Sequence, residues 1–584
     1  MRHCTTRFLT VIIAALLLFT GVDDINAQSN NVKLNAPLVN GGNIGNYEIS
    51  LDSSTVVYIS DQDVDNVLEL YSVPIGGGTP IKLNGPLANN GGVADFIISP
   101  NSSIVVYRAD QDTDGISELY SVPIGGGTSI KLNGLLANNG DVRDYIISPN
   151  GSAVLYEADQ DTNDTIELYN VPIGGGTATK LNGPLVNNGD VRDYIVSPDS
   201  SIVVYSADQD IDQVLELYTV PIDGGTVTKL NEPLQPGGAI YSFDIGSDSR
   251  SVIYREGKVT EFEIELYSVP IDGGTPVKLN EELVEGGTVR ASEISPDGDT
   301  VVYLADQDVD DLIELYSVPI GGGTATQLNA TLVSGGDVWH GYQISADSTR
   351  VVYRADQDTD GVIELYGVPI SGGTVTKLNG LLQADGDVYD YYQISADSTR
   401  VVYRADQDTD EVIELYSVSI SGGTVAKLNS EPPEDVDIDV GYQITPDSIT
   451  VIYIAEQDTI NVPELYAVPI TGGSPSKLNT PLTSVGSTSD DFLISPNDPV
   501  VAYRASQGTI RSFLFELYSV NIDAPYNYNV DNDNAITALD AIYVINRIGD
   551  TKNDENAAAD VDCNGTIDAT DANLVIERIG QRLD

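Results

Sequence analysis

The chain has 584 residues, a formal net charge of −60 at pH 7 and 41% hydrophobic residues. So acidic a chain lacks the basic surface that binding to nucleic-acid phosphates requires, which excludes DNA and RNA as partners. It has two cysteines, Cys4 and Cys563, and the first lies in a segment that we expect to be removed, so an intramolecular disulfide is excluded too.

The first 27 residues have the pattern of a secretory signal peptide. Arg2 and Arg7 stand at the start of an apolar run over 8–21, which is too short to cross a bilayer, and Ala27 ends a small-residue cleavage site. We therefore expect bacterial export, to the outside of the cell or its surface, and no membrane span in the mature chain.

Internal repeats occupy residues 28–523. The tripeptide Glu-Leu-Tyr recurs ten times at intervals of 49, 50 or 52 residues, from Glu69 to Glu516. Each unit contains four strand candidates separated by turn residues, and in one unit they read VRDYIIS, SAVLYEA, TIELYNVPI and TATKLNG. Four antiparallel strands at a period near 50 predict one blade of a β-propeller, and so an all-β fold of about ten four-stranded blades.

The chain begins in the middle of this repeat. A Lys-Leu-Asn strand at Val32–Asn35 follows no Glu-Leu-Tyr strand, whereas the last Glu-Leu-Tyr strand, ending near Asp523, is followed by no Lys-Leu-Asn. We expect the N-terminal strand to complete the last blade, because closure of the ring removes an unpaired strand edge. Propellers usually have four to eight blades, so two smaller rings in tandem and an open solenoid are the alternatives.

The motifs SPDS, VVYRADQDTDG and ELYSVPIDGG resemble the TolB-type propeller repeats of secreted bacterial proteins. The resemblance covers about residues 30–523 and implies the propeller fold. It implies no single function, because such propellers serve both as binding scaffolds and as enzymes.

The turn between the second and third strands is acidic. Seven blades carry Asp-Gln-Asp here, starting at Asp61, Asp110, Asp159, Asp208, Asp306, Asp356 and Asp406. Oxygen ligands at alternate positions suit calcium, which predicts weak metal sites at positions 1, 3 and 5. The clearest candidates are Asp356, Asp358, Asp360, Asp406, Asp408 and Asp410; solvated acidic hairpins are the alternative. The turns that we align from Glu256, Glu456 and Ser506 depart from the pattern and predict poor sites.

Aromatic residues gather at the start of the first strand in three neighbouring units. They are Trp339, His340, Tyr342, Tyr389, Tyr391, Tyr392 and Tyr442. Such a cluster at the mouth of a ring predicts a surface that stacks on a sugar or peptide, and ordinary packing is the alternative.

No G-x-S-x-G or H-E-x-x-H motif occurs, so we predict no catalytic residue; a carboxylate pair that cleaves glycans is the alternative.

The composition changes after residue 524. Two segments align at an offset of 31 and place oxygen-bearing residues at loop positions 1, 3, 5, 9 and 12, with a backbone carbonyl at position 7. This is the ligand spacing of EF-hand-like calcium loops, and an apolar helix follows each loop. The predicted ligands are Asn529, Asp531, Asp533, Ala535, Thr537 and Asp540 in the first loop, and Asp560, Asp562, Asn564, Thr566, Asp568 and Asp571 in the second.

Duplicated calcium loop–helix units of this kind resemble a type I dockerin, over residues 526–584. The resemblance implies two bound Ca²⁺ ions and a cohesin module as partner, and dockerins commonly attach polysaccharide-degrading enzymes to a scaffold or cell surface. Asn534 replaces the usual glycine of the first loop, and Ala538, Leu539, Ala569 and Thr570 stand where familiar dockerins read their cohesin. The sequence thus predicts a secreted binding or scaffold protein, with a carbohydrate-active component as the alternative.

Overall fold

The computed structural model describes residues 31–522 apart from 138–139, 258–262, 385, 410–411, 431–437, 480–481, 483–485 and 507–514. Contacts divide the chain into two units, and Val32–Val520 is the unit that these residues make up. All its elements are β-strands, arranged in ten four-stranded sheets, here called blades one to ten in chain order. Among the described residues, no helix is long and apolar enough to cross a membrane.

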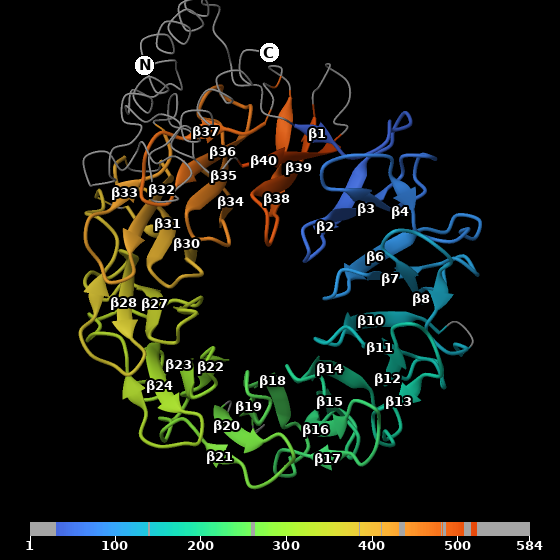
Figure 1. The fold of residues 1–584 in the computed structure, drawn as a ribbon. Helices are drawn as coiled ribbons and strands as arrows, with labels where there is room; N and C mark the ends of the chain where they lie inside the picture. Colours follow the sequence, from blue (N-terminus) through green and yellow to red (C-terminus); the bar gives the residue numbers. More distant parts are fainter. Residues whose placement is uncertain are drawn as a thin grey trace, which may run out of the picture. The chain divides into compact units, whose positions relative to one another are not determined.

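The four strands of each blade run antiparallel, from an inner strand to an outer one (Figure 1). The inner strands of blades one to ten are β2 (Ile44–Ile49), β6 (Val93–Ile98), β10 (Val142–Ile147), β14 (Val191–Val196), β18 (Ala239–Ile245), β22 (Val289–Ile294), β26 (Gln343–Ile344), β30 (Val388–Ile394), β34 (Ile438–Ile444) and β38 (Ser487–Ile494). The second strands are β3 (Thr55–Ser60), β7 (Ile104–Ala109), β11 (Ala153–Ala158), β15 (Ile202–Ala207), β19 (Ser251–Gly257), β23 (Thr300–Ala305), β27 (Arg350–Ala355), β31 (Arg400–Ala405), β35 (Thr450–Ala455) and β39 (Val500–Ser506).

The third strands carry the Glu-Leu-Tyr motif. They are β4 (Glu69–Pro74), β8 (Glu118–Pro123), β12 (Glu167–Pro172), β16 (Glu216–Pro221), β20 (Ile264–Pro270), β24 (Glu314–Pro319), β28 (Glu364–Pro369), β32 (Glu414–Ser419), β36 (Glu464–Pro469) and β40 (Glu516–Asn521). The outer strands are β5 (Ile81–Lys82), β9 (Ile130–Lys131), β13 (Thr179–Lys180), β17 (Thr228–Lys229), β21 (Val277–Lys278), β25 (Thr326–Gln327), β29 (Thr376–Lys377), β33 (Ala426–Lys427), β37 (Ser476–Lys477) and, in blade ten, β1 (Val32–Lys33).

The outer strands are much shorter than the predicted seven residues. Their backbone ladder ends at the leucine of Lys-Leu-Asn, where Leu378 N donates to Leu365 O at 2.8 Å. The side chain of the next residue then continues the pairing, since Asn379 Oδ1 accepts a hydrogen bond from Leu365 N at 2.9 Å. The asparagine therefore replaces further backbone pairing, and the motif recurs because each of its side chains has a defined place.

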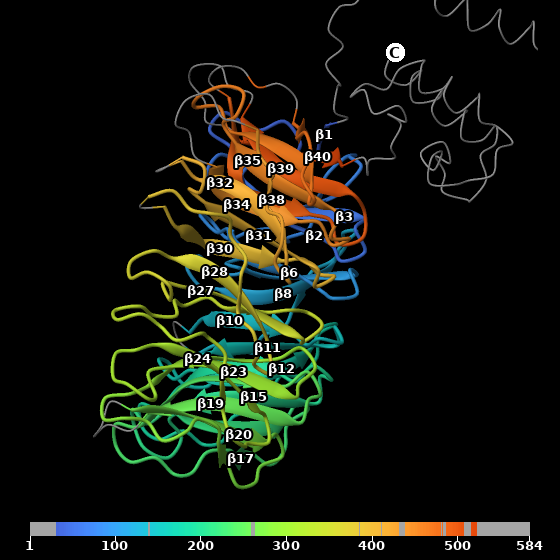
Figure 2. The same ribbon diagram turned by 90° about the vertical axis from the view of Figure 1, so that its left-hand side faces the viewer.

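The N-terminal strand completes blade ten, as the sequence predicts. In β1, Val32 is the antiparallel partner of Ser519 in β40, and Lys33 is the partner of Tyr518. Leu34 N donates to Leu517 O at 2.8 Å, and Asn35 Oδ1 accepts from Leu517 N at 2.9 Å. Figure 2 shows β1 beside β40 in a second view.

The hydrophobic core lies in layers between successive blades. Val57 and Leu70 of blade one pack with Phe96 and Tyr107 of blade two. The junction of blades ten and one is built in the same way, because Leu517 and Leu34 pack in one cluster with Tyr47, Val56 and Tyr58. Ten blades thus form one closed ring, and the two alternative arrangements, tandem rings and an open solenoid, are wrong.

Candidate functional site

The first aspartate of the acidic turns is buried and caps backbone N–H groups. Asp356 Oδ1 accepts from the N–H of Asp337 at 2.7 Å, and its Oδ2 accepts from the N–H of Gly361 at 3.0 Å. Asp406 Oδ1 accepts from the N–H of Asp387 at 2.6 Å in the next blade. These bonds tie the turn to the connection that precedes the inner strand, so they stabilise the turn itself.

The third residue of the turn forms an ion pair with the lysine of the outer strand. Asp358 lies 2.8 Å from Lys377 Nζ, and Asp408 lies 3.3 Å from Lys427 Nζ. Lys377 also pairs with Glu364 of the Glu-Leu-Tyr motif at 2.6 Å. The glutamate that could have joined a calcium site therefore shares a lysine with the turn.

The fifth residue turns towards a glycine of the preceding connection. The carboxylate of Asp360 lies so close to Gly335, whose φ is 92°, that a Cβ on this glycine would be 3.0 Å from both carboxylate oxygens. The other candidate at this position, Asp410, is outside the described residues. Within the described ranges, one group of three acidic side chains is close enough to share an ion, namely Asp306, Asp310 and Asp311. Asp306 already pairs with Arg290 at 3.0 Å. Calcium at Asp356, Asp358, Asp360, Asp406, Asp408 and Asp410 stays a prediction.

Blade five departs from the repeat and contains a pocket. Register places Glu256 opposite Glu265, as Ala109 lies opposite Glu118, so Glu256 replaces the small residue before the turn rather than its first aspartate. The alignment from the sequence was wrong by one position here, because no Asp-Gln-Asp fixes it. Gly257 stands where the other turns have the capping aspartate.

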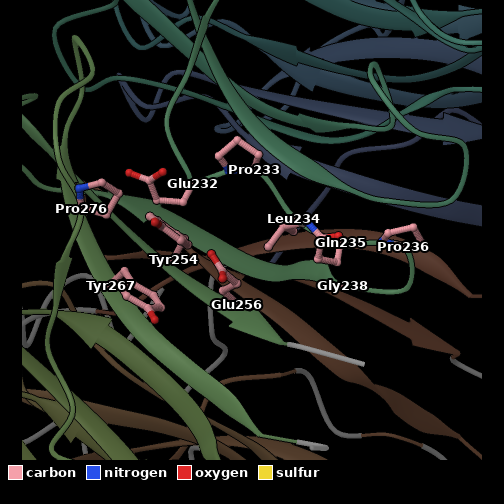
Figure 3. A pocket seen from close by; sticks show the side chains of 10 residues that line it. All are labelled: Glu232, Pro233, Leu234, Gln235, Pro236, Gly238, Tyr254, Glu256, Tyr267 and Pro276. Atoms are coloured by element: carbon pink, nitrogen blue, oxygen red, sulfur yellow. The ribbon is translucent and has the colours of Figure 1, made fainter. Parts of the chain in front are cut away.

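In the regular blades this space contains the glutamine of Asp-Gln-Asp. Gln111 Oε1, for example, accepts from Tyr107 Oη at 2.9 Å and from Gly85 N at 2.7 Å. The corresponding residue of blade five, Lys258, is outside the described residues. A pocket of about 440 Å³ lies beside Tyr254 instead (Figure 3). It is lined by Glu232, Pro233, Leu234, Gln235, Pro236, Gly238, Tyr254, Glu256, Tyr267 and Pro276.

The pocket is acidic and has aromatic and proline walls. Burial raises the pKa of the Tyr254 hydroxyl, and the charges of Glu256 and Glu232 raise it further. Tyr267 Oη donates to Glu265 at 2.6 Å, and Lys278 pairs with that same carboxylate. This arrangement offers hydrogen-bond acceptors and ring faces to a polar ligand. The sequence signal that could have revealed it was the missing acidic turn.

The predicted aromatic surface divides into buried and exposed side chains. Tyr342, Tyr392 and Tyr442 are buried, and their hydroxyls donate to backbone oxygens of the preceding blade, as from Tyr342 to Val302 O at 2.8 Å. These three side chains pack the junctions between blades and offer no ring to a ligand, which corrects that part of the prediction.

Four members of the aromatic group lie at the surface. Trp339 and Tyr391 are 45% and 38% exposed, His340 is exposed and Tyr389 is half-buried. Tyr391 stands edge-on to Tyr442 with 5.0 Å between ring centroids. The face of Tyr391 is thus held in place by a buried ring, and a ligand surface at these four residues stays a prediction.

A family model of the dockerin type I domain matches residues 528–580. Those residues are a type I dockerin domain. The match spans both predicted loops, from Asn529 to Asp571, which lie outside the described residues. Type I dockerin domains bind calcium and have cohesin modules as partners, so calcium as the bound ion and a cohesin as the partner class are confirmed, while the number of ions stays a prediction.

Solved structures similar to this chain come from proteins with different activities. One is a TolB-related structure from Agrobacterium tumefaciens, with a TM-score of 0.26 and 19% identity over 44% of this chain and 85% of the other. An oligogalacturonate lyase from Vibrio parahaemolyticus has a TM-score of 0.33 and 14% identity over 65% and 96%. Prolyl oligopeptidase B from Galerina marginata has a TM-score of 0.35 and 12% identity over 64% and 57%. A comparison with curated proteins found no match.

Proposed function

We propose that this protein is a secreted, calcium-binding scaffold whose propeller presents a ligand surface on a cohesin-bearing extracellular complex. The observation that carries the proposal is the dockerin domain at 528–580. The signal-peptide pattern of residues 1–27 supports export, and the repetition of one blade ten times supports a binding rather than a catalytic role. On this proposal, the dockerin domain binds two calcium ions through the twelve predicted ligands.

Binding of the full chain to immobilised type I cohesins tests the attachment. We expect binding in calcium, loss of binding in excess chelator, and at least a tenfold loss in a chain carrying both Asp531→Ala and Asp562→Ala. The matched control is Asp358→Ala, which removes an aspartate from a propeller turn and should leave cohesin binding unchanged. Cohesin binding that survives chelation would contradict the proposal, and so would a failure to bind any cohesin of a broad panel.

The propeller ligand has two candidate contact areas. The pocket of blade five combines carboxylates with tyrosine and proline walls, and the exposed rings of Trp339 in blade seven and Tyr391 in blade eight are the second candidate. Polysaccharides and peptides are the ligand classes that such surfaces bind, since ring faces stack on apolar groups while carboxylates accept hydrogen bonds.

A carbohydrate-active component is the second candidate function, and the carboxylates Glu232 and Glu256 in the pocket favour it. Screening the secreted chain against polysaccharides, for both binding and reducing-sugar release, separates the candidates. Release that Glu256→Gln abolishes would establish the enzyme. Binding without release, weakened by Trp339→Ala or Glu256→Gln, would establish the scaffold as a glycan-binding one. If no polysaccharide binds, a peptide is the remaining ligand class.

A further inference from the structure

One position of the second strand decides what lies at the junction with the next blade. It follows the buried tyrosine of that strand and is arginine in five blades: Arg108, Arg255, Arg354, Arg404 and Arg504. In four of them the guanidinium donates hydrogen bonds to backbone carbonyls of the inner strand in the next blade. Arg354, for example, lies 3.1 Å from Val388 O, and Arg504 lies 3.0 Å from Ile44 O. These junctions therefore accept a positive charge among oxygen atoms.

A β-bulge presents the carbonyls in this way. In blade three the pairing with the second strand skips Arg143, and the guanidinium of Arg108 donates to the carbonyl of that residue and to Val142 O. Arg108 also pairs with Asp95, which stands opposite it on the neighbouring strand. Blade four has the same bulge, at Arg192. A bulged residue leaves the regular ladder, which frees its carbonyl for a partner outside the sheet.

Blade three has a glutamate in place of the arginine. Glu157 stands opposite Asp144, so two carboxylates face each other where blade two pairs an arginine with an aspartate. Glu157 is 7% exposed, and its Oε1 has no hydrogen-bond partner. The hydroxyl of Tyr194, on the next inner strand, is also without a partner, in a residue that is 8% exposed. Two carboxylates thus face each other beside an unpartnered hydroxyl at this junction.

The charged groups around Glu157 do not compensate the negative charge of its carboxylate. Burial, Asp144 and Asp193 raise the pKa of Glu157 and the nearby Arg143 and Arg192 lower it, and together they bring it to about 8. Burying an ionised carboxylate costs free energy unless a cation or donors compensate it. A positive charge at the place of the missing guanidinium would supply that compensation.

We propose that the junction of blades three and four binds one calcium ion, with Glu157 and Asp144 as carboxylate ligands beside the bulge at Arg192. Calcium takes six to eight oxygen ligands and accepts carboxylates, backbone carbonyls and water together. Two carboxylates and the backbone carbonyls of a bulge are present here, and water would complete the set. The ion is expected where Arg108 places its guanidinium one junction earlier. This site is separate from the dockerin loops and independent of the proposed function.

Calcium-binding stoichiometry of the full chain, measured by equilibrium dialysis, tests the site. Two variants are compared with the wild type: Glu157→Arg restores the arginine of the other blades, and Glu157→Gln keeps the shape while removing the charge. We expect each variant to bind one ion fewer per chain than the wild type, because the dockerin ligands are unchanged. Glu157→Gln keeps the test valid if Glu157→Arg fails to fold.

Thermal unfolding of the propeller gives a second readout. Added calcium should raise the Tm of the wild-type propeller, because a ligand that binds only the folded state stabilises it, and should leave the Tm of both variants unchanged. Equal stoichiometry in all three chains would overturn the proposal. A calcium-dependent rise in Tm of the same size in all three chains would overturn it as well. So would a wild-type Tm that calcium does not change, because Glu157 would then be neutralised by a bound proton rather than by an ion.

Discussion

At the residue scale, each repeat motif corresponds to a defined set of contacts. In blade eight, Glu414 pairs with Lys427 and accepts a hydrogen bond from Tyr416 Oη at 2.8 Å. Tyr416 stacks on Tyr403 of the neighbouring strand, with 5.7 Å between ring centroids. Glu414 is 2% exposed, so these contacts stabilise a buried charge. The side chains of Glu-Leu-Tyr and Lys-Leu-Asn thus belong to one network inside each blade.

Removing the buried glutamate should destabilise the propeller. Glu414→Ala removes the acceptor of the Tyr416 hydroxyl and leaves Lys427 paired with Asp408. Leaving a buried donor without its acceptor costs about 2 kcal/mol. The measurement is the midpoint of urea unfolding. Lys427→Gln is the matched control, because blade six already uses Gln327, whose Nε2 donates to Glu314. A control variant that loses as much stability as Glu414→Ala would contradict this account.

At the element scale, the turn between the first two strands connects neighbouring blades. Ser345 Oγ donates to Asp347 Oδ1 at 2.6 Å, and the N–H of Thr349 donates to the same oxygen at 3.0 Å. The N–H of Asp347 then donates to Ser398 Oγ of the next blade at 3.1 Å. Blades two and three have Asn101 and Asn150 at this position, with the same pattern of bonds to the turn.

These turns make the ring sensitive to acid. Hydrogen bonds from the serine two residues earlier lower the pKa of Asp52, Asp199, Asp297 and Asp347. A carboxyl whose pKa is lower in the folded state stabilises the fold above its unfolded pKa, and that stability is lost as the pH falls below about 4. Changing all four residues to asparagine should reduce the loss of Tm on acidification and leave the Tm at neutral pH nearly unchanged. The reverse change, Asn101→Asp, should increase the loss; an unaltered acid profile in both variants would refute the argument.

Sequence reasoning worked where a motif fixes the register of an element and failed where the motif is missing. Lys-Leu-Asn and Glu-Leu-Tyr occur in fixed order, so the composition of blade ten could be predicted from the ends of the repeat. Glu256 was placed one position too far along because blade five has no acidic turn to align. The burial of Tyr342 was also missed, since residue type alone does not tell which face of an inner strand meets the preceding blade.

At the scale of the whole molecule, the junction of blades ten and one repeats the contacts of the other junctions. The N–H of Asn497 donates to Ser53 Oγ at 2.9 Å, as the N–H of Asp347 does to Ser398 three blades earlier in the ring. Tyr47 Oη donates to Asp491 O at 3.1 Å, and Ser519 Oγ donates to Ile75 O at 2.6 Å. An unpaired edge at β40 would expose a row of backbone donors and acceptors, which β1 satisfies.

Closure of the ring by β1 is tested most directly by a designed disulfide. In a chain with Cys4 and Cys563 replaced by serine, Val32→Cys and Ser519→Cys place two thiols on directly paired residues of β1 and β40. Paired residues of antiparallel strands have Cα atoms about 4.5–5.5 Å apart, within the range of a disulfide. The matched control pairs Val32→Cys with Ser72→Cys, the equivalent position of blade one, whose partner is Ile81 of β5. Thiol titration of the folded, oxidised chain should find no free thiol in the first pair and two in the control. Two free thiols in the first pair, or a disulfide in the control, would contradict a ring closed by the N-terminal strand.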